Sequence, residues 1–266
     1  MNIYNIKAEK VGSVNAPVQF SEEYHPDVIK RAVLAIQSHK RQRYGADPLA
    51  GKKTSVKISK RRRNYRTSYG HGISRVPRKV MWRRGRQFGW EGAYAPGTKG
   101  GRKAHPPKSE KIWDLKINIK ERRKAIRSAL AATFDKILVE ARSHVLPKLF
   151  PLVLDNGIEM LNKTKDVENA LESLGLKDEL ARVHEKRIRA GKGKMRGRKT
   201  MSRKGPLLVV AGTCPLLKAA KNIEGIDVVV VDKLNAEVLA PGAFAGRLTL
   251  YTHKALERLE KEKLFM

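Results

Sequence analysis

The residues of this chain that could do chemistry are mainly cations, and the densest group lies in residues 59–90. This stretch reads SKRRRNYRTSYGHGISRVPRKVMWRRGRQFGW and holds eleven Lys and Arg residues, and no acidic residue occurs before Glu91. Arginine presents a planar set of donors that fits phosphate groups and a flat face that stacks on bases. Trp82 and Trp90 add further stacking faces. The chemistry that these residues predict is recognition of a nucleic acid.

A second group of cations, in residues 189–199, could also bind phosphate. The segment from Gly193 to Thr200 reads GKMRGRKT, which is similar to a nucleotide phosphate loop, but Arg198 separates the last glycine from Lys199. A phosphate loop follows a strand and precedes a helix, whereas we expect a basic helix before this segment and a strand after it. The favoured interpretation is a strip that binds nucleic-acid phosphates, and the alternative is a cationic loop that stays in solvent.

Other residues that catalysis could use are scattered along the chain. Asp155 and Asp232 end expected strands, where such residues usually cap a turn. Cys214, the only cysteine, is expected to be a small buried residue, and a single cysteine excludes an internal disulfide and a multi-cysteine zinc site. His71 lies between two glycines and is expected to contact RNA or solvent. Since no glycine-rich turn has the placement of a dinucleotide site, we expect no enzyme activity, cofactor, metal or small-molecule substrate.

The charge of the chain is unevenly distributed. Its 266 residues are 41% hydrophobic and carry a formal net charge of +31. Residues 40–108 hold 21 Lys and Arg residues against two acids, and residues 182–204 hold 11 against one. All other residues together hold 25 basic and 23 acidic residues, the balance of an ordinary globular domain. A large positive charge predicts a polyanionic partner, and we expect that partner to bind the two cationic segments.

Residues 40–108 lack the apolar pattern that would give them a core. They contain ten of the 21 glycines and seven of the 16 aromatic residues. Neither a helical nor an alternating apolar pattern runs through them, and a segment that buries little apolar surface cannot offset its chain entropy. We therefore expect an extended, non-globular loop that takes shape on RNA and penetrates it. For each aromatic residue, packing against its own hairpin partner remains the alternative.

Residues 1–39 and 109–266 have the pattern of one globular α/β domain, with 182–204 as an RNA-facing loop within it. The run 226–232 is too apolar to face water on either side, which is typical of parallel strands covered by helices. The sequence predicts a three-layer α/β/α sandwich with a mainly parallel sheet and a long basic loop inserted after the first helix. Strands are expected at 2–6, 10–14, 151–155, 206–212, 226–232 and 247–251, and helices at 26–39, 121–143, 164–174, 177–189, 213–222, 234–241 and 252–264.

Three helix starts carry specific signals. Pro26 suits a first helical turn, Asn118 and Glu121 have the spacing of a capping box, and Thr213 is expected to cap the helix that contains Pro215 in its first turn.

The residues that we expect to contact RNA are cations, aromatic residues and one histidine of the two segments. They are Arg61, Arg62, Arg63, Arg66, Arg75, Arg78, Lys79, Trp82, Arg83, Arg84, Arg86, Trp90, Arg102, Lys103, His105, Lys192, Lys194, Arg196, Arg198, Lys199 and Arg203.

Several motifs together resemble the universal L-four family of large-subunit ribosomal proteins, in its archaeal and eukaryotic branch. They occur in the order of the family and cover nearly the whole chain, so that together they are specific although each alone would be weak. They are GGRKAHPP at 100–107, ERR at 121–123, RSALAA at 127–132, RAGKGKMRGRK at 189–199, LAPG at 239–242 and GRLTL at 246–250.

The resemblance implies a structural constituent of the large ribosomal subunit that binds its ribosomal RNA, supports assembly and has no catalytic residues. The long loop would run through the RNA, and its tip, near residues 66–77, would help to line the polypeptide exit tunnel. The residues implied at the tip are Tyr69, Gly70, His71 and Gly72. The implied partners are large-subunit ribosomal RNA, neighbouring ribosomal proteins and the nascent polypeptide, and the implied location is the cytoplasm, in the ribosome.

Two other classes of protein stay open. An RNA-modifying or RNA-cleaving enzyme could carry a basic arm on an α/β domain, although the cofactor loop and clustered acids or histidines that it needs are not evident. A chromatin-like protein could bind duplex DNA. No apolar run is long enough for a signal peptide or a membrane span, so we expect a soluble, intracellular protein with no membrane partner.

Overall fold

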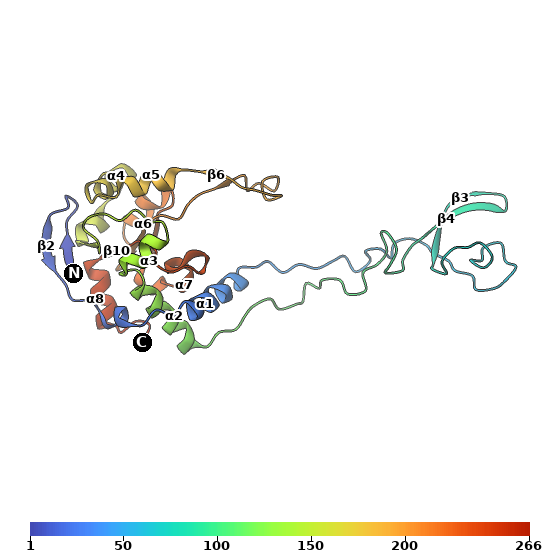
Figure 1. Cartoon of the computed structure of the whole chain (residues 1–266), viewed down its shortest axis with the longest axis horizontal. Helices are drawn as coiled ribbons and strands as arrows, with labels where there is room; N and C mark the ends of the chain where they lie inside the picture. The colour runs from blue at the N-terminus through green and yellow to red at the C-terminus, as the bar shows by residue number, and fades with distance from the viewer. The chain divides into compact units, whose positions relative to one another are not determined.

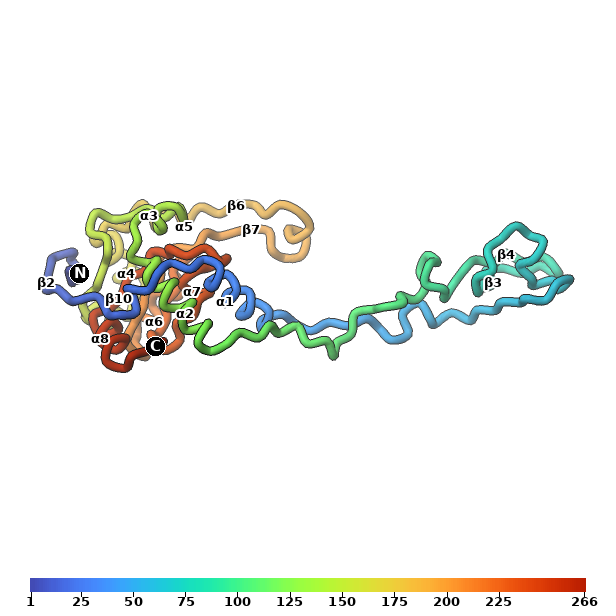
Figure 2. Tube along the Cα trace, turned by 60° about the horizontal axis from the view of Figure 1, so that its bottom comes forward, coloured from blue at the N-terminus to red at the C-terminus, as the bar shows by residue number.

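The computed structural model describes all residues from 1 to 266 and divides into two compact units. Residues 1–40 and 114–266 form one unit, here called the body, and residues 41–113 form the other, here called the loop unit. Figures 1 and 2 follow the chain through both units by colour.

All helices belong to the body. The α-helices are α1 (Pro26–His39), α2 (Ile119–Ala131), α3 (Lys136–Ala141), α4 (Thr164–Ser173), α5 (Lys177–His184), α6 (Leu216–Ala219), α7 (Ala236–Leu239) and α8 (His253–Lys261). The short 3-10 helices are η1 (Val18–Ser21), η2 (Asn156–Met160), η3 (Ala220–Asn222), η4 (Val231–Lys233) and η5 (Pro241–Ala243).

A six-stranded sheet forms the centre of the body. Its strand order is β2-β1-β5-β10-β8-β9. Only β2 is antiparallel to its neighbour, and the other four pairings are parallel. This confirms the expected mainly parallel sheet. The strands are β1 (Asn2–Tyr4), β2 (Lys10–Ser13), β5 (Val153–Leu154), β8 (Leu207–Val210), β9 (Asp227–Val230) and β10 (Thr249–Thr252).

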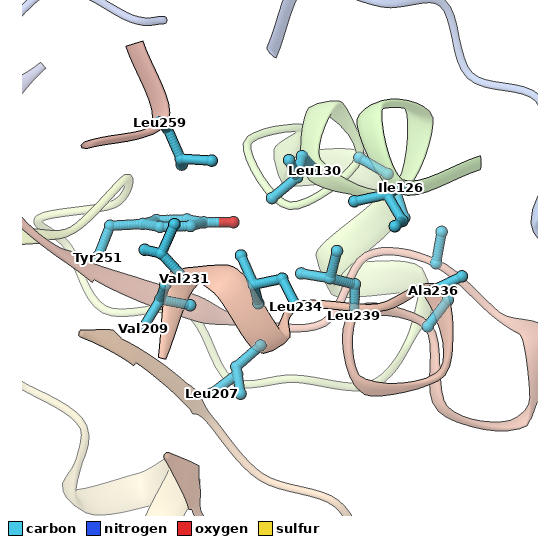
Figure 3. Packing of buried hydrophobic residues seen from close by; sticks show 14 of the residues in the cluster. Ile126, Leu130, Leu207, Val209, Val231, Leu234, Ala236, Leu239, Tyr251 and Leu259 are labelled. Atoms are coloured by element: carbon cyan, nitrogen blue, oxygen red, sulfur yellow. The ribbon is translucent and has the colours of Figure 1, made fainter. Parts of the chain in front are cut away.

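The sheet separates two hydrophobic clusters. Along β8, Val209 belongs to the first cluster, whereas Leu208 and Val210 belong to the second, because successive side chains of a strand point to opposite faces. Helices α1, α2, α7 and α8 contribute to the first cluster, and α4 and α6 to the second. Figure 3 shows Ile126 and Leu130 of α2 in the first cluster together with Val209 and other strand residues. The layers are those of an α/β/α sandwich.

Helix α1 follows the sequence closely, but the second expected helix does not. Helix α1 begins at Pro26, as expected. The expected helix 121–143 is instead two helices, because Asp135 takes the N-cap position of α3 and its side chain accepts the backbone N–H of Ile137 at 2.9 Å. The expected capping box is also wrong. Asn118 precedes α2 without a side-chain cap, and Glu121 instead pairs with Arg31 at 3.0 Å.

Further differences lie in the C-terminal half. Thr213 does not cap a helix, since α6 begins only after Pro215. The expected helix 177–189 ends at His184, where α5 stops. Strand β9 lies at the edge of the sheet, and its four residues are half-buried rather than fully covered. Its side chains still contact both clusters, since Val228 and Val229 lie on opposite faces.

Deleting residues 59–90 is expected to leave the body folded. Neither hydrophobic cluster contains a residue of the loop unit. Changes outside a core usually alter the free energy of unfolding by less than about 0.5 kcal/mol, which corresponds to about 2 °C for a body of this size. Circular dichroism melting of the free protein measures the shift, with Leu207→Ala in the core as a destabilised reference. A fall as large as that of the reference would contradict the prediction.

Candidate nucleic-acid interface

The loop unit contains a β-hairpin whose position the sequence pattern did not indicate. Strand β3 (Arg78–Arg84) pairs with the antiparallel β4 (Gln87–Gly92), with an irregularity between Val80 and Trp82. Trp82 lies opposite Gly89, and a Cβ atom on this glycine would come within 2.1 Å of the indole Nε1 atom. In this position the Trp82 ring leaves no room for a side chain at position 89. The aromatic residues on both sides of RRGR, together with Val80, were the signal for this hairpin.

Aromatic rings of the loop unit pack partly on one another. Phe88 contacts Tyr65 and Trp90 edge to face, with ring centroids 6.0 and 5.0 Å away. The guanidinium of Arg78 lies 5.6 Å from the Trp90 ring centroid. Trp90 is half-buried by these contacts, whereas the Trp82 side chain keeps 58% of its surface exposed. Packing within the loop unit thus covers part of the Trp90 side chain, whereas Trp82 keeps exposed surface that a partner could contact.

The arginines of the loop unit have no acidic partners between positions 61 and 86. The nearest ion pair of this stretch joins Lys79 to Glu91 at 3.9 Å, and no guanidinium there has a carboxylate oxygen within 4.0 Å. Most of these cations are exposed. The Nε atoms of Arg66 and Arg78 are buried without any acceptor. Buried donors nearly always have an acceptor, but the chain supplies none to these two Nε atoms. A bound partner would have to supply it.

The four residues implied at the tip lie in consecutive turns. Gly70 and Gly72 have φ angles of +79° and +65°, which favour glycine, and His71 between them is exposed. The hydroxyl of Tyr69 accepts a hydrogen bond from Arg75 at 3.5 Å, and this contact lowers the pKa of the tyrosine. The chain can therefore present an imidazole and a phenol ring at this position.

The two legs of the loop unit contact each other through their backbones. The N–H of Ala46 donates to the carbonyl of Pro107 at 2.9 Å. A Cβ atom on Gly51, whose φ is +73°, would come within 2.4 Å of the Gly101 backbone, so the legs approach here as closely as glycine allows. The motif GGRKAHPP lies in the second leg. Its Lys103 and His105 are exposed, and Arg102 lies 5.7 Å from the Tyr94 ring centroid.

The second cationic segment is a two-stranded ribbon, here defined as residues 187–201. Strand β6 (Arg187–Ile188) pairs with the antiparallel β7 (Thr200–Met201), and Figures 1 and 2 show the ribbon leaving the body after α5. The helix expected before this segment is present as α5 but ends at His184. Gly191 and Gly197, with φ angles of +76° and +77°, turn the chain back on itself. Five exposed cations without a carboxylate partner lie at its turn: Lys192, Lys194, Arg196, Arg198 and Lys199.

The ends of the segment 182–204 belong to the body. Arg203, which we expected to contact RNA, is half-buried, pairs with Glu185 at 3.0 Å and donates to the carbonyl of Arg182. Lys204 pairs with Asp227 at 2.9 Å. Cations that already have acidic partners have less to offer a phosphate, so the free charge is concentrated between residues 187 and 199.

A buried carboxylate fixes the root of the ribbon, and sequence reasoning missed it. Glu179 is fully buried on α5 and accepts hydrogen bonds from Arg182 and His144, each at 2.6 Å. It also accepts the N–H of Val145 at 2.9 Å. Arg182 donates onward to the carbonyl of Lys204 at 3.0 Å. A glutamate on the apolar face of an amphipathic helix was the only signal in the sequence.

The environment of this network shifts two pKa values. Burial opposes ionisation of Glu179, but hydrogen bonds from Arg182 and His144 outweigh it and hold the pKa of the glutamate below its ordinary value. Burial lowers the pKa of His144, and the hydrogen bond to Glu179 offsets this only in part. The folded state therefore favours an ionised glutamate beside a neutral histidine.

Lowering the pH from 8 to 5.5 is expected to destabilise the protein through His144. In the unfolded chain its pKa is the ordinary 6.5, and in the fold it is lower. The unfolded state thus takes up a proton first as the pH falls below about 6.5, and the free energy of unfolding decreases until the folded pKa is reached. Melting temperatures across this range should fall more steeply for the wild type than for His144→Asn, which keeps a donor but does not titrate. Equal slopes would contradict this assignment.

The carboxyl ends of the parallel strands, where open α/β sheets usually bind ligands, form hydrogen bonds within the body. Glu159 Oε1 accepts both the N–H of Ala211 at 3.1 Å and the hydroxyl of Thr252 at 2.7 Å. Asp155 caps η2 by accepting the N–H of Gly157, and Asp232 accepts a hydrogen bond from an arginine of α8 at 2.9 Å. The expectation of a turn cap is confirmed for Asp155, whereas Asp232 takes no cap position and pairs with the arginine instead.

Three remaining observations concern other kinds of site. Cys214 is half-buried rather than buried, and burial raises the pKa of its thiol. No three side chains among His, Cys, Asp and Glu are grouped so as to hold a metal ion. No helix has both the length and the apolar surface to cross a membrane.

The fold and the two cationic parts define a class of protein. The α/β body has a core of its own, while its ribbon and the loop unit expose cations. The loop unit also carries exposed aromatic rings and buried donors without an acceptor. This arrangement is typical of nucleic-acid-binding proteins, in which phosphate contacts supply much of the affinity.

Comparison with known proteins identifies the family. Residues 14–262 match the model of the ribosomal protein L4/L1 family, and the chain belongs to this family. A protein of Nanoarchaeum equitans named large ribosomal subunit protein uL4 is 54% identical over 264 residues, which cover 99% of this chain and 98% of the relative. Proteins of the same name from Archaeoglobus fulgidus and Methanocaldococcus jannaschii are 46% and 44% identical over 258 and 262 residues, covering 97% of this chain and 96% and 97% of the relatives. The resemblance inferred from the motifs is confirmed.

Proposed function

We propose that this protein is a structural component of the large ribosomal subunit that binds the ribosomal RNA of that subunit and supports its assembly. The relatives from Nanoarchaeum equitans and Archaeoglobus fulgidus are named as proteins of that subunit. In this role the protein has no catalytic residues, and it acts in the cytoplasm as part of the ribosome.

One observation carries the proposal. Two segments account for nearly all of the net charge of +31, and their free cations have no carboxylate partners in the chain. Confining so many like charges without counter-charges is unfavourable in the free protein, whereas phosphate groups would neutralise them and release counterions. Ribosomal RNA supplies phosphates at the required density.

The body and the loop unit have different roles in this proposal. We infer that the globular domain expected from the sequence, residues 1–39 and 109–266, folds independently and presents the ribbon to RNA. The insertion, residues 40–108, then penetrates the RNA, with Tyr69, Gly70, His71 and Gly72 near the wall of the exit tunnel and the nascent polypeptide. Neighbouring ribosomal proteins would contact the remaining surface of the body.

Co-sedimentation tests the proposal. A tagged copy expressed in its host should sediment with large ribosomal subunits and should be released only at high salt. Binding of the purified protein to large-subunit ribosomal RNA should weaken steeply with salt. Sedimentation with free protein fractions alone, or equal protection of duplex DNA, would overturn the proposal.

The RNA-modifying enzyme makes a different prediction. It would bind a small-molecule cofactor with micromolar or tighter affinity on the body. Calorimetric titration of the body with nucleotide and methyl-donor cofactors distinguishes the two functions.

A further inference from the structure

The loop unit contains an open groove of about 960 Å³ that neither the composition nor the motifs indicated. It is lined by Tyr44 of the first leg and by residues of the second leg, from Lys103 to Trp113. Both legs contribute because the hydrogen bond between Ala46 and Pro107 holds them together. We call this hollow the tryptophan groove.

Aromatic surface is available in the tryptophan groove. The rings of Tyr44 and Trp113 stack with centroids 5.5 Å apart and an interplanar angle of 14°. The guanidinium of Arg41 lies 3.9 Å from the centroid of Trp113, and Lys111 Nζ lies 4.4 Å from it. Tyr44 keeps 47% of its surface exposed. The indole is thus held in place by two cations, and the tyrosine ring retains surface on which another flat group could stack.

Polar groups of the groove favour an anionic ligand. Lys103, His105, Lys108 and Lys111 line it together with a single acid, Glu110, and no ion pair joins this acid to the lysines. The Nε1 atom of Trp113 is buried and has no acceptor. A ligand with oxygen atoms beside an aromatic ring would supply the acceptor that this N–H lacks.

We propose that the tryptophan groove binds one unpaired nucleotide of an RNA strand, with its base stacked on Tyr44 and its phosphate held by the lysines. A flat base matches the exposed ring, and a phosphate matches the surplus of cations. A base inside a duplex cannot present its face to a ring, so the nucleotide must be extruded or single-stranded. The inference rests on the proposed function and specifies one contact within it.

Fluorescence of Trp113 tests the proposal in the full-length protein. Trp82→Phe with Trp90→Phe leaves Trp113 as the only tryptophan. The probes are a five-nucleotide oligoadenylate, an abasic phosphodiester of the same length, and adenosine monophosphate. Oligoadenylate should quench Trp113, and the abasic strand should bind without quenching. Weak or absent quenching by the mononucleotide identifies a strand, rather than a free nucleotide, as the source of the base.

The variant Tyr44→Ala should weaken the quenching interaction about tenfold, since stacking on one base is worth about 1–3 kcal/mol. Tyr94→Ala, an exposed tyrosine of the same unit outside the groove, should leave it unchanged. If the two Phe substitutions disturb the hairpin, crosslinking of thiouridine-containing RNA to the wild type, mapped to residues 41–44 and 103–113, replaces the fluorescence readout.

Two results would overturn the inference: equal quenching by the abasic strand, or equal affinities of Tyr44→Ala and the wild type. If the protein still co-sediments with large subunits in either case, the proposed function stands and only the nucleotide site is wrong. A protein that binds neither the oligonucleotide nor ribosomal RNA would contradict the proposed function itself.

Discussion

Replacing all five free cations at the turn of the ribbon with glutamine is expected to weaken binding to large-subunit ribosomal RNA about 100- to 1000-fold near 0.15 M salt. These cations are exposed and have no acidic partner in the chain, so their full charge is available to phosphates. They are Lys192, Lys194, Arg196, Arg198 and Lys199.

The magnitude follows from counterion release. Each phosphate contact on a single strand contributes about 0.7 to the slope of log affinity against log salt, so five contacts contribute about 3.5. The slope should therefore flatten by about 3 to 4, and the loss of affinity should grow as salt is lowered. Filter binding at several salt concentrations measures both quantities.

A matched variant separates local contacts from total charge. Lys7, Lys10, Lys163, Lys165 and Lys177 are exposed, lie outside both cationic segments and take part in no ion pair. Replacing these five with glutamine removes the same charge but should change the affinity by less than about tenfold, because charges beyond a Debye length are largely screened. Equal losses in the two variants would mean that the ribbon acts only through net charge and stays in solvent.

The sequence predicted the body well because its signals are local. The apolar run that contains β8, the run before Asp232 and the amphipathic pattern from His253 each fix the type of an element, and the fold confirms all three. The concentration of positive charge in residues 40–108 and 182–204 was likewise evident from counting charged residues. The break between α2 and α3 was missed because the apolar pattern is continuous across it. The side chain of Asp135 accepts a backbone N–H and so competes with a continuous helix, and the apolar pattern alone does not show which of the two forms.

The candidate interface was predicted only in outline, since its geometry depends on contacts between distant residues. The cations were evident from the sequence, but only the ion pairs of the fold show which of them are free to bind phosphate. Arg203 meets Glu185, whereas Arg196 meets no acid. The stack of Tyr44 on Trp113 joins residues from the two ends of the loop unit, and no spacing rule connects them. A +2 or −2 register in the hairpin would likewise have placed Trp82 against a residue other than Gly89.

Glu179→Ala is expected to lower the free energy of unfolding by about 3–5 kcal/mol, the usual cost of removing one partner from a buried ion pair. The variant leaves the Arg182 guanidinium, the His144 ring and the Val145 N–H without their acceptor. For a domain of this size, this corresponds to a fall in melting temperature of about 6–20 °C. Glu168→Ala, an exposed glutamate on the neighbouring helix α4, is the control and should melt within about 2 °C of the wild type.

The variant Glu179→Ala also distinguishes structural support of the ribbon by the body from the contacts that the ribbon makes with RNA. Arg182 holds the carbonyl of Lys204, so loss of Glu179 should loosen the exit of the ribbon from the body without removing any of its cations. Trypsin should then cleave between residues 182 and 204 faster than in the Glu168→Ala control. Below the melting transition, RNA affinity should fall far less than in the five-cation variant, and the salt slope should stay the same. A flattened slope in Glu179→Ala would mean that the buried network positions the phosphate contacts themselves and does not serve stability alone.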